Sequence, residues 1–268
     1  MPVAPITPTS NAGVITNVSK CTFVWSHDLN SSMAHEDELG IFDWSCAADV
    51  ARIIRYDARG HGGTEALQEY DRAFRWSAMV DDLMRAGGAV PFVAGGAAMG
   101  CATALYAALR APRRVQGLVL AIPPRAWEQR SADAEFYESS ARLVEAKGLP
   151  AWVESLRAEP QPRIFAEELP SARDLSLRHL STMKERVMPA ILRGAAASDL
   201  PTREEIRGIV MPVLILAWAD DPGHPVETAE TLSELLVLSE IHVANDLAGI
   251  RRWPGLVRDF LGGLCQWE

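Results

Sequence analysis

Acidic and imidazole side chains follow several short apolar segments of this 268-residue chain. His27 and Asp28 come soon after the apolar run 21–25, and Asp221 and His224 follow another such run. Carboxylates and imidazoles can act as general acids or bases when their surroundings shift their pKa values toward the working pH. These four residues are therefore candidates for acid–base chemistry.

A glycine-rich turn lies between a predicted strand at 89–94 and a predicted helix at 99–110. The turn reads Gly96-Ala97-Ala98-Met99-Gly100. In so sharp a turn, side chains at the flanking glycine positions would collide with neighbouring backbone. Ala98 is therefore expected to point outward at the head of the helix, with the backbone N–H of Met99 facing the same space.

Short apolar runs alternate with helical patterns along most of the chain. The predicted strands are residues 21–25, 50–56, 89–94, 115–122, 210–218 and 240–244. The predicted helices are residues 72–87, 99–110, 226–236 and 253–264. Continuous apolar strands that alternate with helices are typical of a parallel sheet covered on both faces. We therefore predict an α/β fold with a mostly parallel sheet and helices on both of its faces.

One long stretch, residues 125–206, carries several helical patterns but no good strand. Ligands of open α/β sheets bind along the carboxyl edge, and an insertion after the fourth strand would cover that edge. We predict that residues 1–124 and 207–268 form the core and that 125–206 form a helical cap or lid. A purely structural helical layer is the alternative.

The composition excludes several classes of protein. The formal net charge of −9 opposes sequence-independent binding to nucleic acid. There is no signal-peptide pattern and no apolar run long enough to span a membrane. The four cysteines lack paired spacing, so we predict reduced thiols in a cytoplasmic protein, without a metal or cofactor. A small-molecule substrate is expected as partner, and a homodimer remains possible.

The glycine-rich turn resembles the G-x-S-x-G nucleophile elbow of the α/β-hydrolase superfamily, with Ala98 in place of the serine. Other segments resemble that family in the same order. They are Trp25-Ser26-His27-Asp28-Leu29 for the H-G-x loop, Asp57-Ala58-Arg59-Gly60-His61-Gly62 for the D-x-R-G-x-G turn, and residues 211–225 for the strand and loop that carry the family's acid. The resemblance covers roughly residues 20–264. It implies the α/β-hydrolase fold and an activity on small carboxylic esters or lactones.

The resemblance also implies roles for individual residues. Ala98 stands at the nucleophile position and Asp221 at the acid position. The backbone N–H groups of Met99 and of Leu29, or Asp28, would bind the oxyanion. The carboxylate of Asp28 stands where glycine is usual, and its charge would oppose a developing oxyanion.

The family's histidine is expected after the last strand, where this chain has Asn245 and Asp246. His224, three residues after Asp221, is therefore the tentative base, although a loop histidine with a packing role is an equal alternative.

Further residues near the predicted site are candidates for contacts with substrate. His27, Trp25 and Trp127 are predicted to line it, and Glu128 is the alternative acid because some family members carry theirs on that loop. His27 could instead brace the oxyanion loop.

Three functions follow from these residues. The first is a hydrolase of small esters or lactones in which Ala98 replaces the serine and inactivates this copy. The second is a natural ligand-binding pseudoenzyme. The third is a cofactor-free, lyase-like enzyme in which Asp28, His27 and His224 perform acid–base work.

Overall fold

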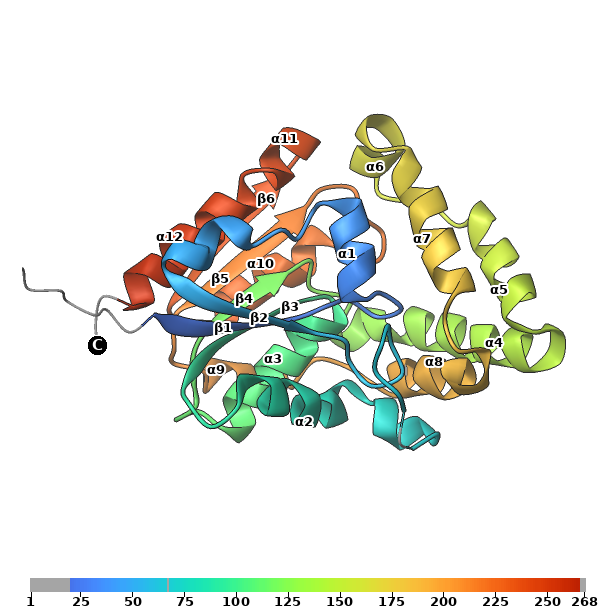
Figure 1. The fold of residues 1–268 in the computed structure, drawn as a ribbon, viewed down its shortest axis with the longest axis horizontal. Helices are drawn as coiled ribbons and strands as arrows, with labels where there is room; N and C mark the ends of the chain where they lie inside the picture. The colour runs from blue at the N-terminus through green and yellow to red at the C-terminus, as the bar shows by residue number, and fades with distance from the viewer. Residues whose placement is uncertain (1–19, 67, 266–268) are drawn as a thin grey trace, which may run out of the picture.

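The computed structural model describes residues 20–66 and 68–265, and its core is a six-stranded sheet (Figure 1). The strands are β1 (Cys21–Ser26), β2 (Ala51–Tyr56), β3 (Phe92–Ala97), β4 (Val115–Ala121), β5 (Val213–Trp218) and β6 (Ser239–Ala244). They lie in the order β2-β1-β3-β4-β5-β6, and every neighbouring pair is parallel. This confirms the predicted α/β fold and its six strands, with small shifts at their ends.

Alternate side chains of each inner strand enter separate apolar clusters on the two faces of the sheet. In β1, Val24 belongs to one cluster, whereas Phe23 and Trp25 belong to the other. The helices α2 (Trp76–Gly87), α3 (Met99–Arg110) and α10 (Val226–Leu235) cover the first face, and α12 (Trp253–Cys265) covers the second. Both faces are buried, which is why the inner strands read as continuous apolar runs.

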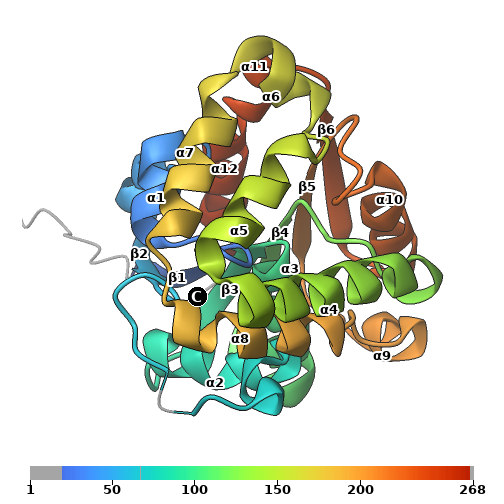
Figure 2. The ribbon, with the colours of Figure 1, turned by 90° about the vertical axis from the view of Figure 1, so that its right-hand side faces the viewer.

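A helical insertion, defined here as residues 130–196, follows β4. Its helices are α4 (Arg130–Lys147), α5 (Leu149–Ser155), α6 (Arg163–Glu168), α7 (Ser171–Ser181) and α8 (Met188–Ala196). In Figure 2, which looks onto this part of the molecule, α5 and α7 lie beside each other and α4 lies along α8. Apolar residues of α4, α5, α7 and α8 join the cluster on one face of the sheet, and Ile164 of α6 joins the cluster on the other, so the insertion has no separate core.

The helix α9 (Arg203–Arg207) packs against α3 and α10 rather than against the insertion. Its residue Ile206 is fully buried in the cluster on that face of the sheet. The core thus resumes a few residues before the predicted boundary at 206.

Outside residues 125–206, two short α-helices have no counterpart in the prediction: α1 (Met33–Leu39) and α11 (Leu247–Ile250). In α1 the buried residues are His35 and Glu36, so a polar face points inward and no apolar period marks the helix. The signal that remains is Ser32, whose side chain accepts the backbone N–H of His35 as an N-cap.

The cysteines differ from one another. Cys21 is disulfide-bonded, whereas Cys46 and Cys101 are free thiols. The side chain of Cys265 lies outside what the structure describes. The prediction of four reduced thiols is therefore wrong for Cys21, because spacing along the sequence does not reveal which cysteines meet in space. Since disulfides are rare in cytosolic proteins, the cysteines no longer favour a cytoplasmic location. No helix within the described residues is long and apolar enough to cross a membrane.

Candidate active site

The turn between β3 and α3 has the strained backbone that its glycines predict. Ala98 has a φ of 45° and a ψ of −100°, a conformation that is uncommon for a residue with a side chain. A Cβ at Gly96 would lie 2.5 Å from the backbone of Gly100, and a Cβ at Gly100 would lie 2.3 Å from the carbonyl oxygen of Ser26. Both positions therefore require glycine. The methyl group of Ala98 stands where the turn presents a side chain.

A cavity of about 120 Å³ opens beside Ala98 at the carboxyl ends of the strands. The residues that line it are Asp28, Leu29, Asn30, Trp76, Ala98, Met99, Pro124, Arg130, Asp133, Tyr137, Gly223 and His224. The structure thus gathers five of the predicted site residues, Asp28, Leu29, Ala98, Met99 and His224, from three separate loops. Trp76, Arg130 and Asp133 were not predicted.

The side chain of Asp28 lies on the two backbone N–H groups that were predicted to bind an oxyanion. Its carboxylate accepts the backbone N–H of Leu29, at 2.5 Å from Oδ1, and that of Met99. These are the two predicted oxyanion donors. Burial raises the pKa of Asp28, although the charge of His224 and the two N–H groups lower it in part. The donors therefore hold a carboxylate of this chain.

His224 and Asp221 form a buried pair on the loop after β5. Nδ1 of His224 lies 2.8 Å from Oδ2 of Asp221, which also accepts the indole N–H of Trp218 at 2.6 Å. The backbone N–H of Gly223 donates to the other carboxylate oxygen at 2.8 Å. Burial alone would raise the pKa of Asp221, but His224 and these donors lower it to about 2. Asp221 is therefore charged and fixes the orientation of the imidazole.

The same surroundings keep His224 protonated. Burial would lower its pKa, but the charge and hydrogen bond of Asp221, with a further contribution from Asp28, raise it to about 9. At neutral pH His224 is an imidazolium that faces the cavity between two carboxylates. It can donate a proton at that pH, whereas the predicted role of base requires that it first lose one.

The insertion supplies part of the cavity wall through α4. Arg130, Asp133 and Tyr137 recur at the spacing of one helix face. The guanidinium of Arg130 lies over the ring of Trp76 at 4.3 Å from its centroid and donates to the carbonyl oxygens of Ser198 and Ala195. A polar face on a partly exposed helix resembles a solvated one in sequence, which is why this wall was missed.

Three predicted contact residues lie outside the cavity. The strand alternation turns Trp25 to the other face of the sheet, where its indole N–H donates to both carboxylate oxygens of Glu36. Trp127 turns toward α9, and its indole N–H donates to the carbonyl of Pro201 at 3.0 Å. His27 is buried and faces backbone groups, not the cavity.

The alternative acid and the usual histidine position contribute nothing to the cavity. Glu128 is exposed and forms a two-point ion pair with Arg203, both contacts at 2.7 Å. Asp246 caps α11 by accepting the backbone N–H of Gly249. Within residues 20–66 and 68–265, no group of three or more His, Cys, Asp or Glu side chains could hold a metal ion.

The family follows from a comparison of sequences. Residues 42–245 match the sequence profile of the alpha/beta hydrolase fold. The chain belongs to the α/β-hydrolase fold family. None of the curated proteins matches it significantly in sequence.

Solved structures of this family share the fold at low identity. An enol-lactonase from Burkholderia xenovorans LB400 is 18% identical, with a TM-score of 0.73, over 90% of this chain and 91% of that one. A thermophilic esterase from Thermogutta terrifontis is 21% identical, with a TM-score of 0.73, over 91% and 92%. MenH from S. aureus is 17% identical, with a TM-score of 0.73, over 92% and 96%. At these identities the likeness establishes the fold alone.

Proposed function

We propose that this α/β-hydrolase family member is a cofactor-free acid–base enzyme, a lyase or isomerase, that acts on a small carbonyl compound. The observation that carries the proposal is the Asp28 carboxylate on the N–H groups of Leu29 and Met99, in the same cavity as the His224–Asp221 pair. Two titratable groups whose surroundings favour opposite roles are typical of an acid–base pair. The methyl group of Ala98 cannot form a covalent intermediate.

The reaction begins with proton transfer from carbon. Asp28 takes the proton from a C–H bond next to the substrate carbonyl, and the electrons of that bond form a C=C bond. The carbonyl oxygen takes the proton of the His224 imidazolium, and its π electrons become the new O–H bond. The products of this step are an enol, a protonated Asp28 and a neutral His224. When Asp28 returns its proton to a different carbon and the enol O–H proton returns to His224, the product is an isomer. When the carbon next to the C=C bond carries a leaving group, the enol O–H proton returns to His224 and the electrons shift to form a conjugated C=C bond. The group departs with its bonding electrons and the proton of Asp28, which gives an elimination.

Deuterium exchange tests this step before the natural substrate is known. Acetylacetone, ethyl acetoacetate and 2-oxobutanoate are incubated with the protein in D₂O, and loss of the C–H signal next to the carbonyl is followed by NMR. The wild-type protein should accelerate the exchange of at least one of them, and Asp28→Asn and His224→Gln should abolish the acceleration. Absence of acceleration with all three compounds, or an unchanged rate in Asp28→Asn, contradicts the proposal.

Hydrolysis of esters or lactones is the second candidate, because the turn at Ala98 has the backbone conformation expected of a nucleophile elbow. If the protein is such a hydrolase, the single variant Ala98→Ser should hydrolyse p-nitrophenyl acetate. Our proposal expects Ala98→Ser to stay inactive, because Asp28 occupies the oxyanion donors and His224 is already protonated. The double variant Ala98→Ser/Asp28→Gly frees those donors. Its activity therefore shows whether the occupied donors or the protonated His224 keep Ala98→Ser inactive.

A further inference from the structure

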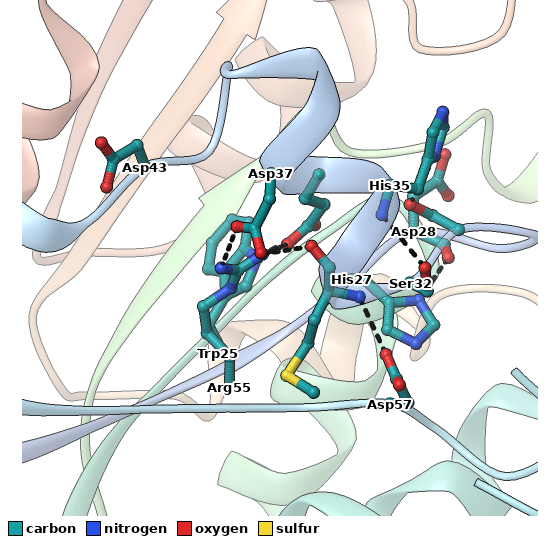
Figure 3. Close-up of polar contacts among 12 residues, drawn as sticks. Trp25, His27, Asp28, Ser32, His35, Asp37, Asp43, Arg55 and Asp57 are labelled. Atoms are coloured by element: carbon teal, nitrogen blue, oxygen red, sulfur yellow. Dashed lines mark hydrogen bonds and ion pairs between the residues drawn. The ribbon is translucent and has the colours of Figure 1, made fainter. Parts of the chain in front are cut away.

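Three histidines that do not line the cavity form hydrogen bonds with the loop between β1 and α1: His27, His35 and His179. Asp28 is connected to them through its backbone carbonyl, which accepts the ring N–H of His27 at 2.7 Å and the backbone N–H of Ser31 at 3.2 Å. Nε2 of His27 accepts the backbone N–H of Ala58 at 3.0 Å, so its proton is on Nδ1. Figure 3 shows His27, Asp28 and His35 around this loop.

Ser31 is the point where the insertion reaches the loop. Its carbonyl accepts a ring N–H of His179 on α7, and its hydroxyl lies 3.0 Å from Nδ1 of His35 on α1. Since Nε2 of His179 is buried without a partner, the donor is Nδ1. Ser31 is itself buried, so water does not replace these contacts.

A second contact fixes the same face of α7. The hydroxyl of Ser176 lies 3.2 Å from Nε2 of His35, and the rings of His35 and His179 stack at 4.5 Å with an angle of 4° between their planes. Ser176 and His179 are three residues apart, so they share one side of the helix. Two side chains of the insertion thus contact the segment that carries Asp28.

We propose that His179 is a positioning residue that couples the seating of α7 on the core to the placement of Asp28. The path runs from the His179 ring to the Ser31 carbonyl, and from the Ser31 N–H to the carbonyl of Asp28. Asp28 then stays on the N–H groups of Leu29 and Met99 and close to His224. The meaning of this coupling for catalysis rests on the proposed function, but the coupling itself does not.

A matched pair of variants separates the hydrogen bond from the ring. His179→Phe keeps a stacked ring and loses the donor, whereas His179→Asn loses the ring and keeps an N–H near the position of Nδ1. The readouts are hydrogen exchange of residues 27–33 and the NMR titration midpoint of the His224 ring, which responds to the charge of Asp28. The variant His242→Phe, on the exposed edge strand β6, is the control.

His179→Phe should raise exchange in residues 27–33 about tenfold or more and lower the His224 midpoint by about one pH unit. His179→Asn should restore both, and His242→Phe should change neither. An unchanged His224 midpoint in His179→Phe, or failure of His179→Asn to restore it, overturns the proposal. Neither readout uses turnover. A protein that accelerates no deuterium exchange but shows these shifts would refute the proposed function and keep His179 as a positioning residue.

Discussion

Two loops at the carboxyl edge of the sheet differ in what they contribute to the cavity: one contributes a strained backbone turn, and the other contributes a carboxyl group. The turn at Ala98 has the strained backbone and the two glycines of a nucleophile elbow, but its side chain is an inert methyl group. The loop after β1 places a carboxyl group, that of Asp28, directly on the predicted oxyanion donors. The elbow thus has the backbone of a nucleophile turn but no reactive side chain. The loop after β1 has a reactive side chain at the position where the resemblance to the family predicts a bound oxyanion.

This difference shows that the chemistry of the site cannot be assigned from the elbow alone. The N–H of Met99 belongs to the elbow, yet it serves Asp28 from another loop. His224 comes from a third loop and is charged because Asp221 and Asp28 are both near it. Asp28, His224 and the N–H of Met99 therefore interact across three loops.

The largest expected effect is the difference in catalysed deuterium exchange between a variant of the loop after β1 and a variant of the elbow. Asp28→Asn should reduce catalysed deuterium exchange by roughly 10²–10⁴-fold, the usual effect of losing a general base. Ala98→Gly should change it by less than about threefold, because it removes no functional group and relieves the positive φ. Exchange rates by NMR in D₂O provide the measurement. A larger loss in Ala98→Gly than in Asp28→Asn would reverse the assignment.

The second effect concerns the backbone of the elbow. Gly100→Ala should lower the free energy of unfolding by at least about 3 kcal/mol, because the new Cβ would lie 2.3 Å from the carbonyl oxygen of Ser26. Gly255→Ala in α12 meets nothing within 4 Å and should stabilise by about 0.5–1 kcal/mol. Urea unfolding of both variants measures the contrast. Similar free energies for the two would show that the elbow can relax around a side chain.

The sequence predicts the sheet well because its signals are local. Every inner strand is a short apolar run, and glycines at 96 and 100 mark a sharp turn that only a strand-to-helix junction explains. The candidate pair Asp221 and His224 is also local, since three residues separate them. Such features depend on neighbours in the chain: the structure confirms the strands and has His224 in contact with Asp221.

The remaining parts of the site depend on contacts between distant segments. Arg130 reaches the cavity because α4 folds over the sheet. The role of His179 depends on the packing of α7 against α1. No periodicity or spacing in the sequence encodes these distances, so residue type alone could not reveal them.

The third effect is the pH dependence of stability that the His224–Asp221 pair produces. The pKa of His224 rises from 6.5 in the unfolded chain to about 9 in the folded one, so its contribution is fully present below pH 6.5 and lost as pH rises through 9. The full loss is on the order of 3 kcal/mol. In His224→Gln this alkaline loss should disappear, whereas in His242→Gln it should remain. Urea unfolding between pH 6 and 10 checks it, and an unchanged slope in His224→Gln would contradict the charged state of His224.

The smallest effect tests the indole that holds Asp221. Trp218→Phe removes the N–H donor at 2.6 Å from Oδ2 and should lower the free energy of unfolding by about 1.5 kcal/mol, since hydrogen bonds to charged groups contribute about that much. The pKa of Asp221 is about 2 in the folded protein, so its contribution is present above pH 3.8 and is lost as pH falls through 2. Without the Trp218 N–H donor, the loss of stability at acid pH should begin at a higher pH.

The control is Trp44→Phe, because the indole N–H of Trp44 is buried without a partner and its removal breaks no hydrogen bond. The two substitutions remove the same atoms from buried rings, so the difference between them isolates the hydrogen bond. A contradicting result would be that the two variants lose the same free energy of unfolding and show the same fall in stability at low pH. That result would mean that the Trp218 N–H does not hold Asp221. The orientation of His224 would then rest on the backbone N–H of Gly223 and on Asp221 alone.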